Sequence, residues 1–112
     1  MADKAWKAFE REIARLIRGA RFWANSGESL DCESHHFVAQ CKHVKSMSLN
    51  AVAQLAEEIK QDGEDNRTPT GLPAPKYGIL ALKTRPGKGK KSTTLIVMEQ
   101  EVFKQLVKKA EL

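Results

Sequence analysis

The apolar residues of this chain switch several times between helical and strand spacing, and this switching limits the possible folds more than any other feature. Spacings of three and four predict an amphipathic helix over residues 4–17, ended by Gly19. Its apolar stripe consists of Trp6, Phe9, Ile13, Leu16 and Ile17. Residues 20–23 are predicted to form a short strand, and residues 37–42 alternate as a strand does. One face of residues 37–42 should therefore pack, while the other carries Gln40 and Lys42.

The second half of the chain predicts a helix, a hairpin and a final helix. The first of these helices spans about residues 49–61, and its expected buried positions are Leu49, Val52, Ala53, Ala56 and Ile59. Residues 62–76 form the one long loop, a candidate mobile segment. Two apolar runs, 77–82 and 93–98, are joined by a basic connection and predict an antiparallel hairpin. A helix over residues 101–109 follows, with apolar positions at Val102, Phe103, Leu106 and Val107.

The order helix, three strands, helix, two strands, helix predicts an α/β or α+β layered domain. A chain of 112 residues suffices for one core, so residues 1–112 are expected to form a single domain. No apolar run approaches the roughly 20 residues of a membrane span, and Met1 leads into a charged amphipathic segment. We therefore expect a soluble, cytoplasmic protein without membrane contact, in which Cys32 and Cys41 are reduced thiols.

Positive charge is concentrated near the C-terminal end. The formal net charge is +5 at pH 7, and residues 83–112 hold eight Lys or Arg against three acids. Five basic side chains and no acid fall within residues 83–91: Lys83, Arg85, Lys88, Lys90 and Lys91. Such a density suits a phosphate backbone, which makes nucleic acid the leading class of partner. A solvated basic loop is the alternative interpretation.

Four polar residues have the spacing of a metal-dependent nuclease site. Glu10 lies beside the apolar stripe of the first helix, where a carboxylate needs a partner. Gln40 and Lys42 project side by side from one strand, and a strand end or turn can bring Asp31 across to them. Mg²⁺ prefers hard oxygen ligands, and phosphodiester cleavage needs an activated water and compensation for charge on the phosphorane. Asp31 would bind the metal, Gln40 would offer its amide oxygen, and Lys42 would orient the water or stabilise the transition state.

These residues resemble the PD-(D/E)XK nuclease superfamily, and within it the small Holliday junction resolvases of archaeal type and their phage-encoded relatives. Residues 9–14, Phe-Glu-Arg-Glu-Ile-Ala, are similar to the family's opening helix with its functional Glu. Asp31 matches the first catalytic acid, and residues 40–43, Gln-Cys-Lys-His, occupy the (D/E)XK position. Residues 48–56 are similar to the helix that follows in the phage forms, and residues 77–109 match those forms in order and length.

The resemblance implies a restriction-endonuclease-like α/β domain, in which helices flank a mixed five-stranded sheet. It also implies Mg²⁺-dependent hydrolysis of DNA, with Mn²⁺ as a substitute, and a homodimer that acts on a branched substrate such as a four-way junction. The catalytic residues would be Glu10, Asp31, Gln40 and Lys42, of which the first three would be metal ligands. A phage-encoded resolvase would act in the host cytoplasm. The residues expected to contact DNA are Arg11, Arg15, Ser26, Lys45, Lys83, Arg85, Lys88, Lys90 and Lys91.

Position 40 departs from the family pattern, because Gln40 stands where the family carries Glu or Asp. A neutral ligand should weaken Mg²⁺ binding, so the chain is a low-activity nuclease, a variant that uses another acid, or an inactive form. Glu33 is the nearest spare carboxylate, although a solvated hairpin acid is the more common role for such a residue. Gln54 is a candidate accessory residue, because a glutamine often lies near the site in the phage forms.

Other functions stay open at this point. A DNA-binding module would keep the fold and the basic surface without catalysis, and a nuclease acting on linear or flapped duplex would share every site residue. A zinc site is a third alternative, but its residues fit structural zinc spacings poorly: Cys32, His35, His36, Cys41 and His43. Four aromatic residues at periodic positions are expected in the core and not as stacking platforms for bases: Trp6, Phe9, Trp23 and Phe103.

Overall fold

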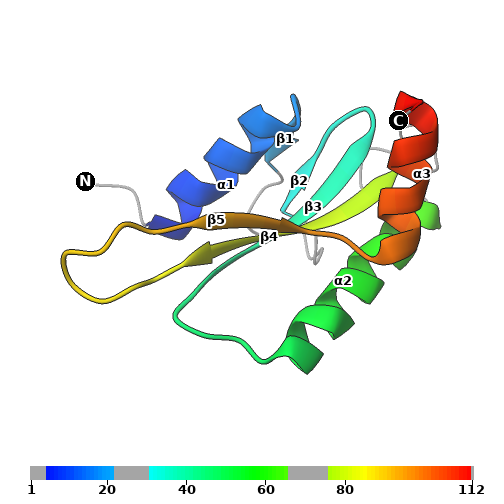
Figure 1. Cartoon of the computed structure of the whole chain (residues 1–112). Helices are drawn as coiled ribbons and strands as arrows, with labels where there is room; N and C mark the ends of the chain where they lie inside the picture. Colours follow the sequence, from blue (N-terminus) through cyan, green and yellow to red (C-terminus); the bar gives the residue numbers. More distant parts are fainter. Residues whose placement is uncertain (1–4, 22–30, 66–75, 112) are drawn as a thin grey trace.

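The computed structural model describes residues 5–21, 31–65 and 76–111. Within these ranges the chain forms helices and one five-stranded sheet in the predicted order (Figure 1). The helices are α1 (Ala5–Leu16), α2 (Leu49–Glu64) and α3 (Gln100–Ala110). The strands are β1 (Ala20–Arg21), β2 (Cys32–Glu33), β3 (Phe37–Val44), β4 (Tyr77–Thr84) and β5 (Thr94–Val97). The expected α/β class with a mixed five-stranded sheet is confirmed.

The sheet is mixed because one connection crosses over while the others turn back. Its strand order is β1-β2-β3-β4-β5. Strands β3 and β4 are parallel along their whole length, from Phe37 opposite Tyr77 to Val44 opposite Thr84, and the other neighbouring pairs are antiparallel. Parallel neighbours need a long crossover connection, and α2 lies in that connection. The predicted hairpin of residues 77–82 and 93–98 is confirmed as the antiparallel pair of β4 and β5.

Helices α1 and α2 pack on opposite faces of the sheet (Figure 1). On one side, which we call the α1 face, Phe9 and Ile13 pack in a cluster with Ala39. On the other side, the α2 face, Val38 packs with Ile59. Because successive strand residues point to opposite faces, both faces of β3 are buried near its start, at Val38 and Ala39. The predicted alternation of β3 is confirmed, with Val38 as an additional core residue on the face that carries Gln40 and Lys42.

Two glycines allow backbones to approach where a side chain would collide. A Cβ on Gly78 would lie 2.0 Å from the carbonyl oxygen of Ile59, so α2 rests directly on β4. A Cβ on Gly19 would lie 2.1 Å from the carbonyl oxygen of Glu33. The prediction that Gly19 ends α1 needs correction, because Arg18 takes the left-handed conformation (φ 61°) at this helix end. Gly19 is required instead by its close contact with β2.

Several apolar side chains that were predicted to be buried are exposed. Leu49 is 82% exposed, Phe103 is 58% exposed and Trp6 is 40% exposed. Ala53 is also exposed, and Trp23 lies outside the described residues. Trp6 and Leu49 lie in the first turns of their helices, while Phe103 is one residue, or about 100° of helical rotation, from the buried Val102. Helical periodicity marks the apolar side of a helix, but it does not show how far the small sheet covers that side.

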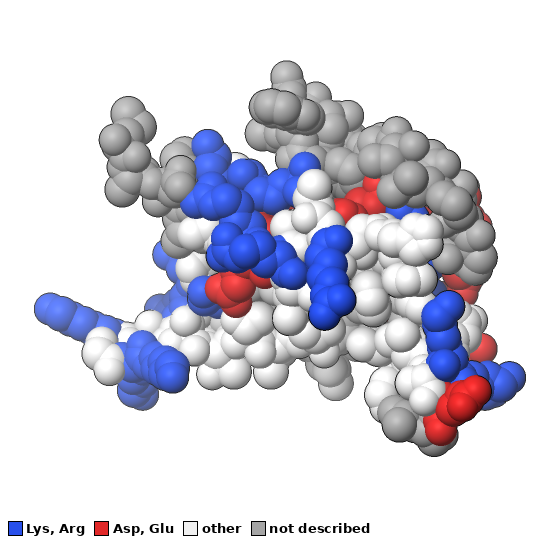
Figure 2. Space-filling view, turned by 90° about the horizontal axis from the view of Figure 1, so that it is seen from above, with Lys and Arg blue, Asp and Glu red and all other residues white. Residues whose placement is uncertain are grey.

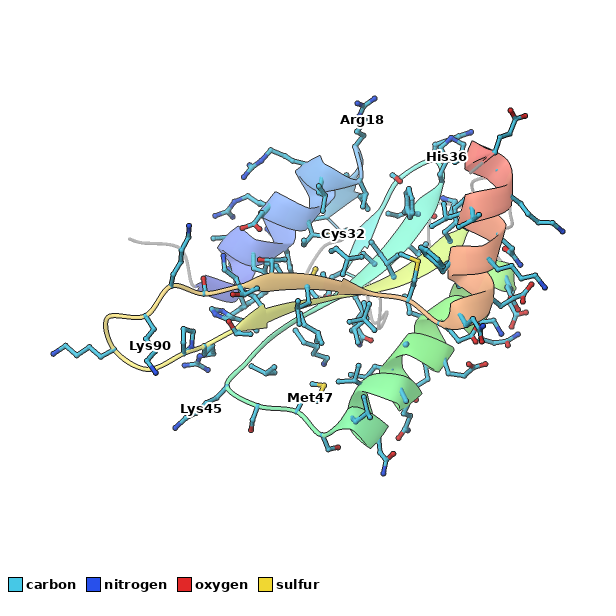
Figure 3. The ribbon with its side chains drawn as sticks, in the orientation of Figure 1. Arg18, Cys32, His36, Lys45, Met47 and Lys90 are labelled. Atoms are coloured by element: carbon cyan, nitrogen blue, oxygen red, sulfur yellow. The ribbon has the colours of Figure 1, made fainter. Side chains whose placement is uncertain are left out.

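An apolar groove with a volume of about 330 Å³ opens on the α2 face. Leu49 and Val52 line it on the helix side, and Leu82 and Leu95 line it on the sheet side. The segment that joins β3 to α2 also borders the groove and contains Met47, which is labelled in Figure 3. Leu49 therefore borders a surface groove and does not fill the core.

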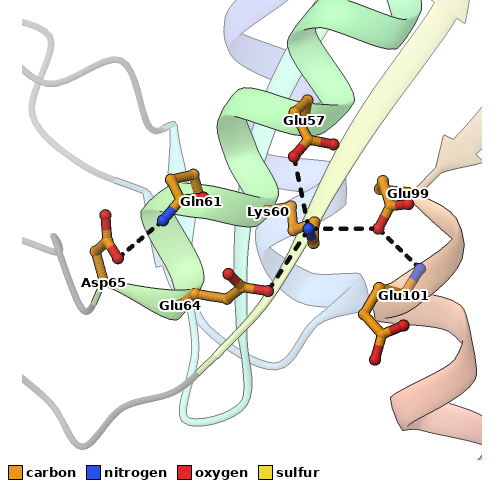
Figure 4. A network of polar contacts seen from close by, with 7 residues as sticks. All are labelled: Glu57, Lys60, Gln61, Glu64, Asp65, Glu99 and Glu101. Carbon is orange, nitrogen blue, oxygen red and sulfur yellow. Dashed lines mark hydrogen bonds and ion pairs between the residues drawn. The ribbon is translucent and has the colours of Figure 1, made fainter.

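A cluster of charged residues connects α2 to the start of α3 (Figure 4). Lys60 Nζ lies 3.5 Å from Glu57 Oε1, 3.9 Å from Glu64 Oε1 and 3.7 Å from Glu99 Oε2. Glu99 Oε2 also accepts the N–H of Glu101 at 2.8 Å, which caps α3.

Helix α2 continues beyond its predicted end into the segment expected to be a loop, and residues 66–75 of that segment lie outside the described residues. None of the described helices is long and apolar enough to cross a membrane.

Candidate metal and nucleic-acid site

Asp31 lies directly before β2, against the neighbouring strand β3. Its backbone N–H donates to the carbonyl oxygen of Ala39 at 2.9 Å, and its Oδ2 accepts the backbone N–H of Cys41 at 2.7 Å. These two bonds flank Gln40. The carboxylate of Asp31 is therefore held beside the strand segment that carries Gln40 and Lys42.

Glu10 approaches the same region from α1. Its Oε1 accepts a hydrogen bond from Arg21 Nε at 3.0 Å and lies 2.9 Å from Arg21 Nη2. The backbone carbonyl of Glu10 accepts the thiol of Cys32 at 3.3 Å, which ties α1 to β2. The partner that this carboxylate requires is thus Arg21, a residue that sequence analysis missed. No local pattern in the sequence pointed to Arg21, because a basic residue in a two-residue strand does not show which carboxylate it will meet.

Burial and its charged neighbours shift the pKa of Asp31. The pKa of Asp31 is raised from 3.8 to about 6, mainly because burial disfavours its charged form. The negative charge of Glu10 and a side-chain hydrogen bond with Glu10 raise this pKa further. The N–H of Cys41 and the positive charge of Lys42 act in the opposite direction. Metal ligands must be deprotonated, so a cation at this site would displace the proton from Asp31.

Lys42 and Gln40 project from β3 on the α2 face, as alternation from the buried Val38 requires. Lys42 is close enough for its charge to lower the pKa of Asp31. Within the part of the chain that the structure describes, no hydrogen bond joins Gln40 to Asp31 or to Glu10. The structure thus brings Asp31 into electrostatic contact with Glu10 and with Lys42, and Gln40 lies beside Lys42 on the α2 face of β3.

The oxygen donors of Glu10 and Asp31 suit a hard divalent cation. Mg²⁺ commonly binds through one or two carboxylates and keeps several of its waters, so two acids are a sufficient protein contribution. Across residues 5–21, 31–65 and 76–111, no group of three or more His, Cys, Asp or Glu side chains forms a metal site. The zinc alternative gains no support, because Cys32 is buried against Glu10 and the rings of His35 and His36 contact each other at the start of β3.

Glu33 occupies a different environment from the one predicted. The expectation that it is a solvated hairpin acid is wrong, because its side chain is 2% exposed and forms an ion pair with Lys76, whose side chain is fully buried. The two atoms in contact are Glu33 Oε2 and Lys76 Nζ. Moving Glu33 toward Asp31 would leave Lys76 as a buried charge without this partner, at a cost of several kcal/mol. This burial argues against Glu33 as a spare metal ligand.

Basic side chains gather over α1 and at the connection between β4 and β5 (Figure 2). Most of the described residues that were expected to contact DNA are exposed: Arg15, Lys45, Arg85, Lys88, Lys90 and Lys91. Arg11 and Lys83 are partly exposed, and Lys83 Nζ lies 3.2 Å from Glu12 Oε1. Lys45 and Lys90 extend outward near the same end of the sheet in Figure 3. Ser26 lies outside the described residues.

Gln54, the candidate accessory residue, faces solvent on α2. Its Nε2 donates to Glu58 Oε1 at 3.2 Å, one turn further along the same helix. The described contacts therefore place Gln54 in a surface pair and do not connect it with Asp31.

No protein-family profile, curated protein or solved structure matches the chain. The chemistry of the site is therefore inferred from its own residues. The carboxylate of Asp31 interacts with that of Glu10 and with the charge of Lys42, and basic side chains gather over α1, the helix that carries Glu10. Carboxylates can hold a divalent cation, and a lysine can compensate negative charge that develops on a phosphate ester. The arrangement is suited to metal-assisted hydrolysis of a polyanionic substrate.

Proposed function

We propose that this protein is a Mg²⁺-dependent endonuclease that hydrolyses phosphodiester bonds in DNA, with a four-way junction or similar branched DNA as its substrate. The observation that carries this proposal is the position of Asp31, whose carboxylate is held against β3 by the N–H of Cys41 and interacts with Glu10 and with the charge of Lys42. The basic side chains over α1, the helix that carries Glu10, support DNA as the polyanion. A mixed sheet with helices on both faces is compatible with a restriction-endonuclease-like fold.

Each residue of the site has a role that follows from its surroundings. Asp31 and Glu10 would hold the cation, and Gln40 would contribute its amide oxygen. The bound cation supplies an acidified water and neutralises charge on the phosphate. Lys42 would orient the attacking water or stabilise the negative charge that develops on the phosphorane. Arg21 is a positioning residue, because it holds Glu10 through two contacts.

Resolution of a four-way junction requires two symmetric cuts, so the proposed function includes a homodimer with one site in each copy. Sedimentation at about micromolar protein should show a dimer, either free or on junction DNA, because the affinity must allow two copies to act together. A strict monomer in both conditions would exclude resolution and leave nicking or DNA binding.

A DNA-binding module without catalysis is the second candidate function. The observation that favours it is the neutral Gln40 at the position where a third oxygen ligand is expected. Gln40→Glu adds a negative charge beside Asp31, so metal affinity and cleavage in Mg²⁺ should both rise. Adding Lys42→Ala should remove the gain in cleavage, because Lys42 acts on the water or the phosphorane and not on metal binding.

The decisive assay compares the chain as given, Gln40→Glu and the double variant on labelled four-way junction, flapped duplex and linear duplex, in Mg²⁺ and in EDTA. Gln54→Glu is the matched control, because it adds the same charge at an exposed position on α2. If Gln40→Glu is as inert as the starting chain while DNA binding persists, the protein is a binding module. If the starting chain already cuts well and Gln40→Glu changes nothing, Gln40 is not a ligand. Cleavage of linear duplex equal to that of the junction would exclude structure selectivity.

The salt dependence of DNA binding tests the basic connection separately from catalysis. If Lys88, Lys90 and Lys91 each contact a phosphate, replacing all three with Gln should flatten the plot of log affinity against log salt by roughly 0.9 for each lost contact. Lys108 and Lys109 of α3 offer a control pair that is also exposed but lies away from the connection. An unchanged slope in the triple variant would make the connection a solvated basic loop.

A further inference from the structure

His43 is a partly exposed histidine near the end of β3 to which sequence analysis assigned no role in DNA binding. It lies opposite Lys83 in the parallel register of β3 and β4, so both side chains project from the α1 face. The ring of Phe9 contacts both, with the His43 ring centroid at 6.3 Å and Lys83 Nζ at 5.5 Å from the Phe9 ring. An imidazole and an ammonium group thus lie over one apolar ring.

Arg85 adds a second positively charged residue to this cluster, after Lys83. Its backbone N–H donates to the carbonyl oxygen of Val44 at 3.0 Å, which holds it beside the end of β3. Burial lowers the pKa of His43 from its ordinary value of 6.5, and the charges of Arg85 and Lys83 lower it further. From α1, the Phe9 ring contacts His43, and Glu12 pairs with Lys83. The charges that act on the imidazole are therefore positive ones, from Lys83 and Arg85.

We propose that His43, Lys83 and Arg85 form a binding site for one backbone phosphate of DNA, and that His43 takes up a proton when the phosphate binds. The three side chains offer imidazole, ammonium and guanidinium donors, which are good partners for phosphate oxygens. Lys83 can turn from Glu12 to the phosphate at little cost, because exposed ion pairs contribute little stability. The site deepens the proposed function and rests on it, because DNA supplies the phosphate.

The sign of the expected pH effect follows from the charges. In the free protein, Lys83 and Arg85 oppose protonation of His43, and a bound phosphate anion offsets them. The pKa of His43 is therefore higher in the complex than in the free protein. DNA affinity should rise as the pH falls through the pKa of the complex and level off below the pKa of the free protein, by about tenfold for each unit between the two.

The experiment measures affinity for a duplex of about 12 base pairs, in EDTA and at constant ionic strength, from about pH 5.5 to 8. All variants carry Asp31→Asn, because the pKa of the Asp31 carboxyl is raised to about 6 and would otherwise titrate in the same range. In this background the affinity should rise as the pH falls, and adding His43→Gln should flatten that dependence. Adding His35→Gln instead should leave it intact, because His35 is exposed near the opposite end of β3.

A second measurement on the unsubstituted protein does not depend on variant folding. NMR titration should show the pKa of His43 rising on addition of the duplex, and rising less on addition of inorganic phosphate. If His43 titrates identically in all three conditions, or if His43→Gln keeps the full pH dependence, the phosphate site is refuted even where DNA binds. If inorganic phosphate shifts the pKa of His43 but DNA does not bind, the anion site stands and the proposed function fails.

Discussion

Asp31 and Glu33 are acidic residues on either side of Cys32, yet their carboxylates lie in opposite electrostatic environments. Glu33 is buried and forms an ion pair with the buried Lys76. Asp31 is half-buried, accepts the N–H of Cys41, and feels both the negative charge of Glu10 and the positive charge of Lys42. A carboxylate with its own buried cation is committed to the fold. Burial and the nearby Glu10 favour the protonated form of Asp31. Such a carboxyl group can exchange its proton for a metal cation.

The comparison predicts that breaking the buried pair has the largest effect on stability. Lys76→Met leaves Glu33 buried without this cation, so the free energy of unfolding should fall by about 3–5 kcal/mol. Denaturation in urea measures this loss. Lys60→Met is the control, because Lys60 also pairs with acids but at a more exposed position, and it should lower the free energy of unfolding much less than Lys76→Met does. Equal losses in the two variants would mean that burial does not distinguish the Glu33–Lys76 pair.

A second, smaller effect is expected at Asp31, with the opposite sign. The pKa of its carboxyl is about 6 in the folded protein against 3.8 ordinarily, so its protonated form stabilises the fold. That contribution is fully present below pH 3.8 and is lost as the pH rises through 6. Asp31→Asn should therefore be more stable than the unsubstituted protein at about pH 7, by about 1–2 kcal/mol once partial exposure is allowed for.

Urea unfolding of Asp31→Asn and the unsubstituted protein as a function of pH tests this prediction. The difference between them should shrink as the pH falls from about 7 toward 3.8, because the Asp31 carboxyl then becomes neutral as well. An Asp31→Asn variant that is less stable at about pH 7 would show that the charged carboxylate contributes to the fold, as Glu33 does.

The smallest effect concerns Lys42. Its positive charge lowers the pKa of Asp31, so Lys42→Met should raise that pKa above about 6. NMR titration of the Asp31 carboxyl measures the shift, and Lys45→Met is a control at the exposed residue that follows β3. An unchanged pKa in Lys42→Met would remove Lys42 from the site and weaken the case for its role in phosphate chemistry.

Much of the fold could be predicted from local patterns, because apolar spacing reports the period of each element. The order of elements, the alternation of β3 and the hairpin of β4 and β5 all followed from such spacing. The pairing of Glu33 with Lys76 could not be predicted, because the two residues lie 43 positions apart and meet only through the sheet. The need for Gly19 is similar, since it arises from a contact with Glu33 on another strand.

The candidate site was also predictable only in part, because some of its contacts join residues that are distant in the sequence. Glu10, Asp31 and Lys42 were selected from sequence, and the structure brings the charges of Glu10 and Lys42 within reach of Asp31. Arg21 was missed, because a basic residue in a short strand carries no local signal of the carboxylate it will meet. The exposure of Leu49 and Phe103 was missed as well, because helical periodicity does not report the extent of the sheet beneath a helix.

Metal binding by Asp31 tests the central claim most directly. Titration with Mn²⁺ at about pH 7, followed by electron paramagnetic resonance, should show binding to the unsubstituted protein and at least about tenfold weaker binding to Asp31→Asn, because an anionic oxygen ligand is lost. Glu58→Gln removes an exposed carboxylate that pairs only with its helix neighbour Gln54 among the described contacts, and it should bind Mn²⁺ as the unsubstituted protein does. Equal Mn²⁺ affinity in Asp31→Asn and the unsubstituted protein would contradict the account.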